Sequence, residues 1–266
     1  MSLNKKNSIL ETKNLTIGYV QEKSIKTVQK NINLQVFNQE FITILGKNAI
    51  GKSTLLRTLS KIQQPLYGDL LIKNRNIEEY NFKELSTVIS LVLTERLPES
   101  QLTVFELVAL GRQPYTNWIG KLEKRDLEIV TWALQRTDTE TLAKRHFHEL
   151  SDGQLQRVLI ARALAQDTEI IILDEPTAHL DMHHTIKIFQ LLKKLSEETN
   201  KTIIITTHEV NLAINSADQI ILLTDEEVIS GTKEELVIRN SFKTLFPSEI
   251  IKFDKSLEQF IITKKF

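Results

Sequence analysis

The chain of 266 residues contains no cysteine, which excludes disulfide bonds, thiolate metal ligands and thiol nucleophiles. It also has no excess of charge of either sign, since 34 lysine and arginine residues balance 34 aspartate and glutamate residues. Proteins that wrap DNA or RNA usually carry a basic excess, so this balance argues against nucleic acid as the main partner.

Long apolar runs are absent as well. The N-terminal stretch MSLNKKNSILETKN lacks the apolar segment of about 7–15 residues that a signal peptide contains. No segment approaches the roughly 20 apolar residues of a membrane-spanning helix, and the longest runs, such as EIIIL and QIILL, have the length of strands. We therefore expect a soluble, cytoplasmic protein that reaches a membrane only by docking on a partner.

Apolar runs of strand length alternate with helical patterns along most of the chain. FITIL, IIIL and TIIITT are continuous apolar runs, as in strands that are buried on both faces. This alternation predicts a parallel sheet with helices on both faces. Residues from about 82 to 150 have mostly helical patterns, broken at Pro98 and Pro114, and are expected to form a separate helical subdomain. In the tail, EIIKF and QFIIT flank DKSLE and predict a hairpin.

The segment ILGKNAIGKSTLL, residues 44–56, carries the spacing G-x-x-x-x-G-K-[ST] between a predicted strand and a predicted helix. Backbone N–H groups of such a loop point at phosphate oxygens, its lysine adds a point charge, and its hydroxyl can bind Mg²⁺. We expect phosphate to be bound by one continuous set of residues: Gly46, Lys47, Asn48, Ala49, Ile50, Gly51, Lys52, Ser53 and Thr54. Ser53 is the expected Mg²⁺ ligand. Ala49 stands where glycine is frequent, and its methyl group is tolerable if φ is negative there.

Two adjacent carboxylates, Asp174 and Glu175, follow the apolar run IIIL. A buried strand that ends in acids presents them at the carboxyl edge of its sheet, where ligands of open α/β folds bind. Asp174 is suited to hold Mg²⁺, directly or through water, and Glu175 to orient or deprotonate an attacking water molecule. An alternative is that these acids only cap the next helix. The phosphate loop earlier in the chain favours the catalytic role over this alternative.

Between the phosphate loop and these acids lies LSDGQ, followed by the helical pattern LQRVLIARALAQ. Here the sequence resembles the ATP-binding cassette (ABC) ATPases, whose signature is commonly L-S-G-G-Q, with Asp152 in place of the first glycine. The resemblance continues through DEPTAHLD, which looks like the family's D-loop and ends at Asp181. In TTHE, His208 looks like the family's switch histidine. Tyr19 stands where the family stacks an aromatic ring on adenine.

The resemblance covers residues 9–232 and implies both a fold and a mechanism, with residues 233–266 as a C-terminal extension. The fold would be α/β, a P-loop NTPase with a parallel-sheet core, an N-terminal antiparallel β subdomain and an inserted helical subdomain. Two cassettes would pair head to tail, as a homodimer or with a relative, and enclose ATP and Mg²⁺. ATP would lie between the phosphate loop of one and the signature of the other, formed by Ser151, Asp152, Gly153 and Gln154. Glu175 and His208 would be catalytic.

Within the family, TVFELVALGRQPYTNWIG resembles the helical region of importer ATPases that serve iron-siderophore, haem and cobalamin permeases. This resemblance implies an ATPase subunit on the cytoplasmic face of the cell membrane, bound to permease subunits and served indirectly by a substrate-binding protein. The same stretch also fits ordinary helix packing, with Tyr115 and Trp118 as core aromatics. Two alternatives stay open: a soluble ABC ATPase of an assembly complex, such as an iron–sulfur cluster scaffold, and an exporter subunit.

One position departs from the family pattern. The family usually places a glutamine that touches Mg²⁺ between the core and the helical subdomain, but none occurs at the expected distance in LVLTERLPESQLTVFELV. Thr94 falls at that distance, with Glu95 next to it, whereas Gln101 lies too close to Thr103. We expect Thr94 or Glu95 to take the role, Thr94 through its hydroxyl as a Mg²⁺ ligand.

Six histidines raise the question of a metal site. His179 and His183 have the i, i+4 spacing of zinc-binding helices, and His146 and His148 form a second close pair. The glutamate of the zinc motif is absent, so we interpret these histidines as D-loop and surface residues.

Overall fold

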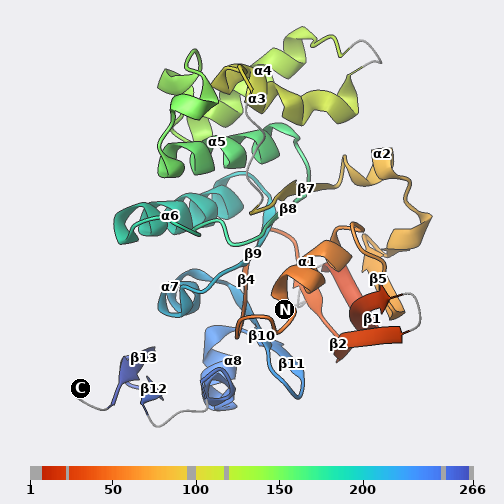
Figure 1. The fold of residues 1–266 in the computed structure, drawn as a ribbon, viewed down its shortest axis with the longest axis vertical. Coiled ribbons are helices and arrows are strands. Elements are labelled where there is room, and N and C mark those ends of the chain that lie inside the picture. The colour runs from red at the N-terminus through yellow and green to blue at the C-terminus, as the bar shows by residue number, and fades with distance from the viewer. Residues whose placement is uncertain (1–7, 22–23, 95–99, 117–119, 247–249, 264–266) are drawn as a thin grey trace, which may run out of the picture. The chain divides into compact units, whose positions relative to one another are not determined.

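The structure is a computed structural model that describes residues 8–21, 24–94, 100–116, 120–246 and 250–263. These residues belong to two compact units (Figure 1). The first unit combines Met1–Glu79 with Thr202–Phe266, and the second is Tyr80–Lys201. The cassette limits expected from the sequence, 9–232, and the extension, 233–266, stay predictions.

Antiparallel strands form the N-terminal part of the first unit. They are β1 (Ser8–Gln21), β2 (Ser24–Ile32), β3 (Gln35–Phe37), β5 (Tyr67–Ile72) and β6 (Arg75–Asn76). β1 pairs with β2, β3 and β5, and β6 pairs with β5. The short 3₁₀ helix η1 (Ile77–Glu79) follows β6. Leu10, Leu15 and Ile17 of β1 are fully buried, so this region has an apolar core of its own. The predicted N-terminal antiparallel region is confirmed.

A parallel arrangement forms the rest of the first unit. Its strands are β4 (Phe41–Gly46), β9 (Thr202–Thr206), β10 (Gln219–Leu223) and β11 (Val228–Gly231). β4 runs parallel to both β9 and β10, and β11 pairs with β10 in the antiparallel sense. β9 is buried along its whole length, which explains its continuous apolar sequence. Its helices are α1 (Lys52–Leu59), α7 (Val210–Ser216), α8 (Lys233–Ile238) and the 3₁₀ helix η5 (Ser241–Thr244).

The second unit contains a short parallel pair of strands, β7 (Ile89–Val92) and β8 (Ile170–Leu173). Its helices are α2 (Phe82–Leu85), α3 (Val104–Ala109), α4 (Lys124–Arg136), α5 (Asp152–Ala165) and α6 (Met182–Glu198), with 3₁₀ helices η2 (Leu110–Tyr115), η3 (Glu140–Leu142) and η4 (Phe147–Glu149). α3 and α4 pack on each other and on α5 (Figure 1). Strand β7 lies inside the range expected to be helical, so that expectation was incomplete.

The sequence offered two aromatic residues for the core of the second unit, Tyr115 and Trp118, and the structure describes one of them. Tyr115 is 42% exposed, and the Arg112 guanidinium lies over its ring at 4.1 Å from the centroid, so the core assignment was wrong for this residue. Trp118 lies outside the described residues.

The tail forms the predicted hairpin, in which β12 (Ile251–Asp254) pairs with β13 (Gln259–Ile262). Asn211 of α7 exchanges two hydrogen bonds with the backbone of Phe260 and thereby attaches the hairpin to the first unit. Phe260 also packs on Phe242, Phe246 and Phe253. None of the helices in the described segments combines the length and the apolar character that a membrane span requires.

Candidate functional site

The phosphate loop leaves the carboxyl end of β4 and enters α1, as the sequence predicted. Gly51 precedes α1 with φ 113°, a conformation that L side chains rarely adopt. A Cβ at this position would also lie 2.4 Å from Cγ1 of Val28 on β2. Glycine is therefore required at Gly51 on both conformational and steric grounds.

The exposed part of the loop runs from Lys47 to Ala49. Ala49 has φ 61°, so the negative φ on which tolerance of its methyl group was expected to depend is not found. This left-handed conformation costs a residue with a Cβ about 1–2 kcal/mol. Strain of this kind persists where surrounding contacts fix the backbone, and it is common at ligand-binding loops.

The Lys52 side chain is almost fully buried, and its ammonium lies against the loop. It donates to the carbonyls of Gly46 at 3.1 Å and Lys47 at 3.3 Å, and it lies 3.5 Å from Nε2 of His208. His208 follows β9, and the parallel pairing of β9 with β4 explains why residues 156 positions apart meet. A buried ammonium at the N-terminus of α1 suits a polyphosphate, because its charge and the helix dipole both favour an anion.

Two side chains from the antiparallel strands also contact this region. Gln29 on β2 is buried and donates to the carbonyls of Ile50 at 3.3 Å and Thr224 at 2.8 Å, so it holds the loop. Tyr19 on β1 forms a 2.7 Å hydrogen bond between its hydroxyl and that of Thr54 in α1. Its ring is 42% exposed, which leaves surface for an adenine ring, and its stacking role stays a prediction. Gln29 had no signal in the sequence, because a lone glutamine in a strand is usually a surface residue.

In the second unit, Asp174 and Glu175 follow β8 as predicted. The Asp174 N–H donates to the Val92 carbonyl at 2.9 Å, which extends the hydrogen bonding between β7 and β8. Glu175 has φ 47°, and its carbonyl accepts from the Ala178 N–H at 3.0 Å, so the chain turns at this acid. A strained backbone at a carboxylate is typical of functional sites.

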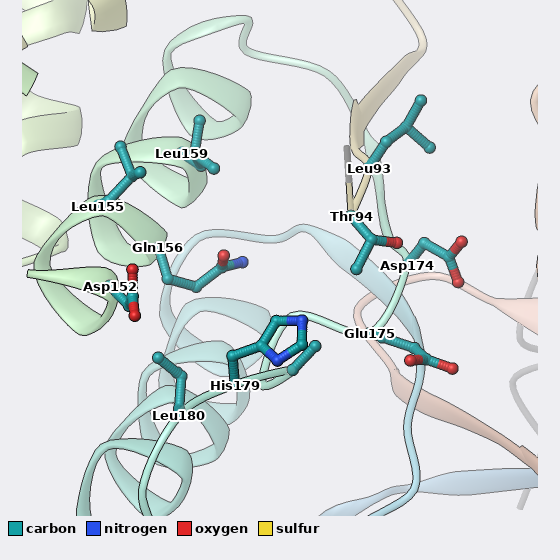
Figure 2. A pocket seen from close by; sticks show the side chains of 11 residues that line it. Leu93, Thr94, Asp152, Leu155, Gln156, Leu159, Asp174, Glu175, His179 and Leu180 are labelled. Carbon is teal, nitrogen blue, oxygen red and sulfur yellow. The ribbon is translucent and has the colours of Figure 1, made fainter. Parts of the chain in front are cut away.

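Thr94, Asp174 and Glu175 line one pocket of the second unit, together with side chains of α5 and of the turn after β8 (Figure 2). Because β7 runs parallel to β8, Thr94 and the two acids follow the same ends of these strands. A hydroxyl and two carboxylates fit Mg²⁺, which prefers oxygen ligands. Among the described residues, no cluster of three or more His, Cys, Asp or Glu side chains is suited to hold a metal ion, and Mg²⁺ commonly takes further ligands from substrate phosphates. Glu95, the alternative to Thr94, lies outside the described residues.

The signature segment forms the N-terminus of α5. The Ser151 hydroxyl accepts from the Gln154 N–H at 3.4 Å, and the Gln154 side chain accepts from the Ser151 N–H at 3.1 Å, which makes a capping box. Asp152, the residue that departs from the usual signature, is exposed in the first turn. Gly153 packs against α6, where a Cβ would lie 2.7 Å from Cδ2 of His184. This glycine is therefore needed for close approach of two helices.

The D-loop residue Asp181 caps α6. Its carboxylate accepts from the N–H and from Nδ1 of His184, each at 2.8 Å, and these donors hold the pKa of Asp181 below its usual value. Because His184 also covers Gly153, one imidazole connects the D-loop with the signature segment. His179 precedes α6 with φ 67°, so His179 and His183 do not share a helix, and the helical spacing noted in the sequence was wrong.

The other histidine pair lies in the described part of the second unit. The rings of His146 and His148 stack with their centroids 5.5 Å apart, and Nδ1 of His146 lies 2.8 Å from the Gln101 carbonyl. This pair thus joins the segment before α3 to the segment that precedes Ser151.

The candidate site residues form two groups, one in each unit. The first holds the phosphate loop with Tyr19 and His208, and the second holds the acids, Thr94, the signature and the D-loop. The ABC transporter family matches residues 29–178, more than half of the chain. The chain belongs to the ABC transporter family. As an ABC cassette it binds ATP and hydrolyses it, and the predicted fold class is confirmed.

Relatives of this cassette include import proteins. The petrobactin import ATP-binding protein FpuD of Bacillus anthracis is 38% identical over 241 residues, covering 90% of this chain and 87% of FpuD. The ferric enterobactin transport ATP-binding protein FepC of Escherichia coli is 36% identical over 238 residues, covering 89% of this chain and 86% of FepC. Among solved structures, the dimeric cassette MJ0796 bound to ADP and Pi has a TM-score of 0.72 and 33% identity, covering 84% of this chain and 98% of MJ0796.

Proposed function

We propose that the cassette is the ATP-hydrolysing subunit of an ABC importer that energises uptake of an iron-siderophore, haem or cobalamin-like chelate through a membrane permease. The observation that carries the proposal is the similarity, over about 90% of the chain, to proteins named for petrobactin import and ferric enterobactin transport. The two groups of site residues support the ATPase part of it.

The first unit binds the phosphates of ATP. Lys52 gives up its bonds to the loop carbonyls and neutralises the β- and γ-phosphate oxygens, while loop amides donate to the same oxygens. His208 lies within reach of the Lys52 ammonium and contacts the γ-phosphate, so it reports whether that group is present. Tyr19 stacks on the adenine ring beside Thr54.

The second unit supplies the hydrolytic groups. Asp174 and Thr94, which line one pocket, would hold Mg²⁺, directly or through water. Ser53 of the phosphate loop stays a predicted ligand of the same ion. When bound, the ion neutralises charge that develops on the phosphate oxygens. Glu175 orients the attacking water and accepts its proton, a role that suits a carboxylate fixed at a backbone turn.

The active form is a head-to-tail homodimer. The N-terminus of α5, with Ser151, Asp152, Gly153 and Gln154, faces the γ-phosphate bound by the other copy, since its helix dipole favours an anion. Asp181 lies in the same interface. The solved dimer of MJ0796 with ADP and Pi supports such a pairing.

The dimer works on the cytoplasmic face of the cell membrane, bound to integral permease subunits that receive the chelate from a substrate-binding protein. ATP closes the dimer and hydrolysis reopens it, so the γ-phosphate biases a two-state element. The transported chelate does not contact this subunit.

The test combines a tagged chain, gentle detergent extraction of native membranes, and uptake of radiolabelled ferric siderophores, haem and cobalamin by cells that lack the chain. We expect a polytopic permease to co-purify, and we expect the wild type, but not Lys52→Ala, to restore uptake of one chelate. Soluble partners alone, with uptake independent of the chain, would overturn the importer proposal in favour of an assembly ATPase. Efflux that depends on the chain would indicate an exporter.

A further inference from the structure

One side chain of α7 pairs with the backbone of the tail hairpin. Asn211 donates from Nδ2 to the Phe260 carbonyl at 3.2 Å, and its Oδ1 accepts from the Phe260 N–H at 2.8 Å. The amide therefore bonds to β13 in the way that a residue of a neighbouring strand would. A two-stranded hairpin is at best marginally stable by itself, so contacts of this kind decide where it lies.

The hairpin is also anchored to elements other than α7. The rings of Phe253 and Phe260 pack on Phe242 of η5, with centroids 4.6 and 6.3 Å from it, and Phe242 is fully buried. Lys233 of α8 forms an ion pair with Glu258, in the turn between β12 and β13. Because α8 packs on β11, the hairpin is a fixed support to which the Asn211 amide is bonded.

The first turn of α7 is less deeply packed than the rest of the helix. The buried residues of α7 are Ala213 and Ile214, its fourth and fifth. Val210, Asn211 and Leu212 before them are only half-buried. A segment with few buried apolar contacts opens more readily than a core segment, so the two hydrogen bonds to the hairpin matter most at this turn.

His208 comes directly before this turn. Its carbonyl accepts from the Val210 N–H at 3.0 Å, and the Glu209 N–H donates to the Thr207 hydroxyl at 3.0 Å. The backbone of His208 is thus held between the end of β9 and the first turn of α7. Its Nε2 lies 3.5 Å from the Lys52 ammonium at the phosphate loop. A shift of this turn therefore moves the imidazole relative to the loop.

We propose that Asn211 is a positioning residue for recognition of the γ-phosphate. It holds the first turn of α7 on the tail hairpin and thereby sets the position of the His208 imidazole. The inference rests on the proposed contact of His208 with the γ-phosphate. It also gives the hairpin a function, as the support of the element that distinguishes ATP from ADP.

The experiment measures the affinities of the full chain for ADP and for the non-hydrolysable ATP analogue AMP-PNP, both with Mg²⁺, by calorimetry. The variant is Asn211→Leu, which keeps the shape of the side chain and removes both bonds to Phe260. We expect the affinity for AMP-PNP to fall about two- to thirtyfold, the range for residues that act on a site through another element. The affinity for ADP should not change, because ADP has no γ-phosphate for His208 to contact.

Asn215, one turn later on α7, is the matched control. It donates from Nδ2 to the Asn211 carbonyl at 2.9 Å, a bond within the helix, so Asn215→Leu should leave both affinities unchanged. Phe260→Ala loosens the hairpin from its own side, because it removes the packing on Phe242 without altering α7. This variant should lower the affinity for AMP-PNP relative to ADP as well, and it decides the question if Asn211→Leu does not fold.

The same measurements in a His208→Ala background separate the possible failures. Asn211→Leu should cause no further loss there, because the residue through which it acts is gone. An unchanged ratio of the two affinities in Asn211→Leu overturns the inference, and so does an equal loss for both nucleotides, which marks general damage to the fold. A further loss in the His208→Ala background also overturns it. If His208→Ala alone leaves the ratio unchanged, the proposed role of His208 fails instead.

Discussion

Replacing Arg112 with methionine tests a buried ion pair of the second unit. Arg112 of η2 donates from Nε to Oδ1 of Asp126 in α4 at 2.9 Å, and only 4% and 9% of the two side chains are exposed. It also donates from Nη1 to the Ala165 carbonyl at the end of α5, at 2.8 Å. The other carboxylate oxygen of Asp126 accepts from the Glu123 N–H at 2.9 Å. One guanidinium therefore connects η2, α4 and α5.

The loss of stability in Arg112→Met follows from the buried carboxylate that the substitution leaves without its partner. In Arg112→Met the Asp126 carboxylate stays buried without its ion-pair partner, and removing one partner of such a pair destabilises a fold by about 3–5 kcal/mol. The lost bond to the Ala165 carbonyl is part of the same network and does not add independently. We expect the free energy of unfolding to fall by about 3–5 kcal/mol.

The pH dependence of the wild type gives a second check. Burial by itself raises the pKa of Asp126, but the Glu123 N–H and the Arg112 guanidinium outweigh it and the pKa is lowered. A lowered pKa in the folded state means that the pair stabilises the fold above the unfolded-state pKa of about 4 and that this contribution is lost as pH falls through the folded-state value. Removing the guanidinium raises the pKa, so the acid-induced loss should begin at higher pH in Arg112→Met.

Urea unfolding at pH 7, followed by circular dichroism, measures the change. Arg136→Met is the matched control, because Arg136 and Glu198 form a pair of 2.8 Å with 41% and 45% of their side chains exposed. Exposed pairs contribute about 0–1 kcal/mol, so the control should stay within that range. The reasoning is refuted if Arg112→Met costs no more than Arg136→Met.

Three further variants test the nucleotide site. Glu175→Gln should keep ATP binding and trap a closed dimer while hydrolysis falls about 10²–10⁴-fold, the range for loss of a general base; near-normal phosphate release would refute the role of Glu175. Ala49→Gly should stabilise the chain by about 0–1 kcal/mol in urea unfolding, because relief of the left-handed strain exceeds the added entropy of the unfolded chain; a loss of stability would contradict the strain. Gly51→Ala should destabilise it by about 1–3 kcal/mol and weaken ATP binding measured by calorimetry, because its Cβ would meet Val28; unchanged binding would contradict this.

The strands that are buried on both faces were predictable from sequence, because such strands have a continuous apolar run. β4, β8 and β9 carry such runs, and each has the predicted type. β7 was missed since its four residues, ISLV, lie between helical patterns, and a run this short does not separate strand from helix by periodicity. That omission mattered, because β7 is the element that carries the chain to Thr94.

Site residues were predictable from sequence where they belong to one short continuous segment. The phosphate loop and the signature are short segments whose spacing reflects one turn of backbone. Contacts set by tertiary structure were not predictable, such as Gln29 holding the Ile50 carbonyl or His184 covering Gly153. The conformation of Ala49 was likewise not predictable, because alanine ordinarily adopts a negative φ, whereas this loop holds it at φ 61°.

The signature helix α5 explains why one element can serve several of these roles. It has 14 residues and is about 21 Å long at 1.5 Å per residue. Ser151 caps its N-terminus, Gly153 packs against the His184 imidazole of α6, Gln156 lines the pocket that Asp174 and Glu175 also line, and its last carbonyl, on Ala165, accepts from Arg112. A helix is stiff along its axis, so Ser151 at its start and the Ala165 carbonyl at its end belong to one rigid body. Because Asp152 and Gln156 of α5 line the same pocket as Asp174 and Glu175, a displacement of this helix changes the lining of that pocket.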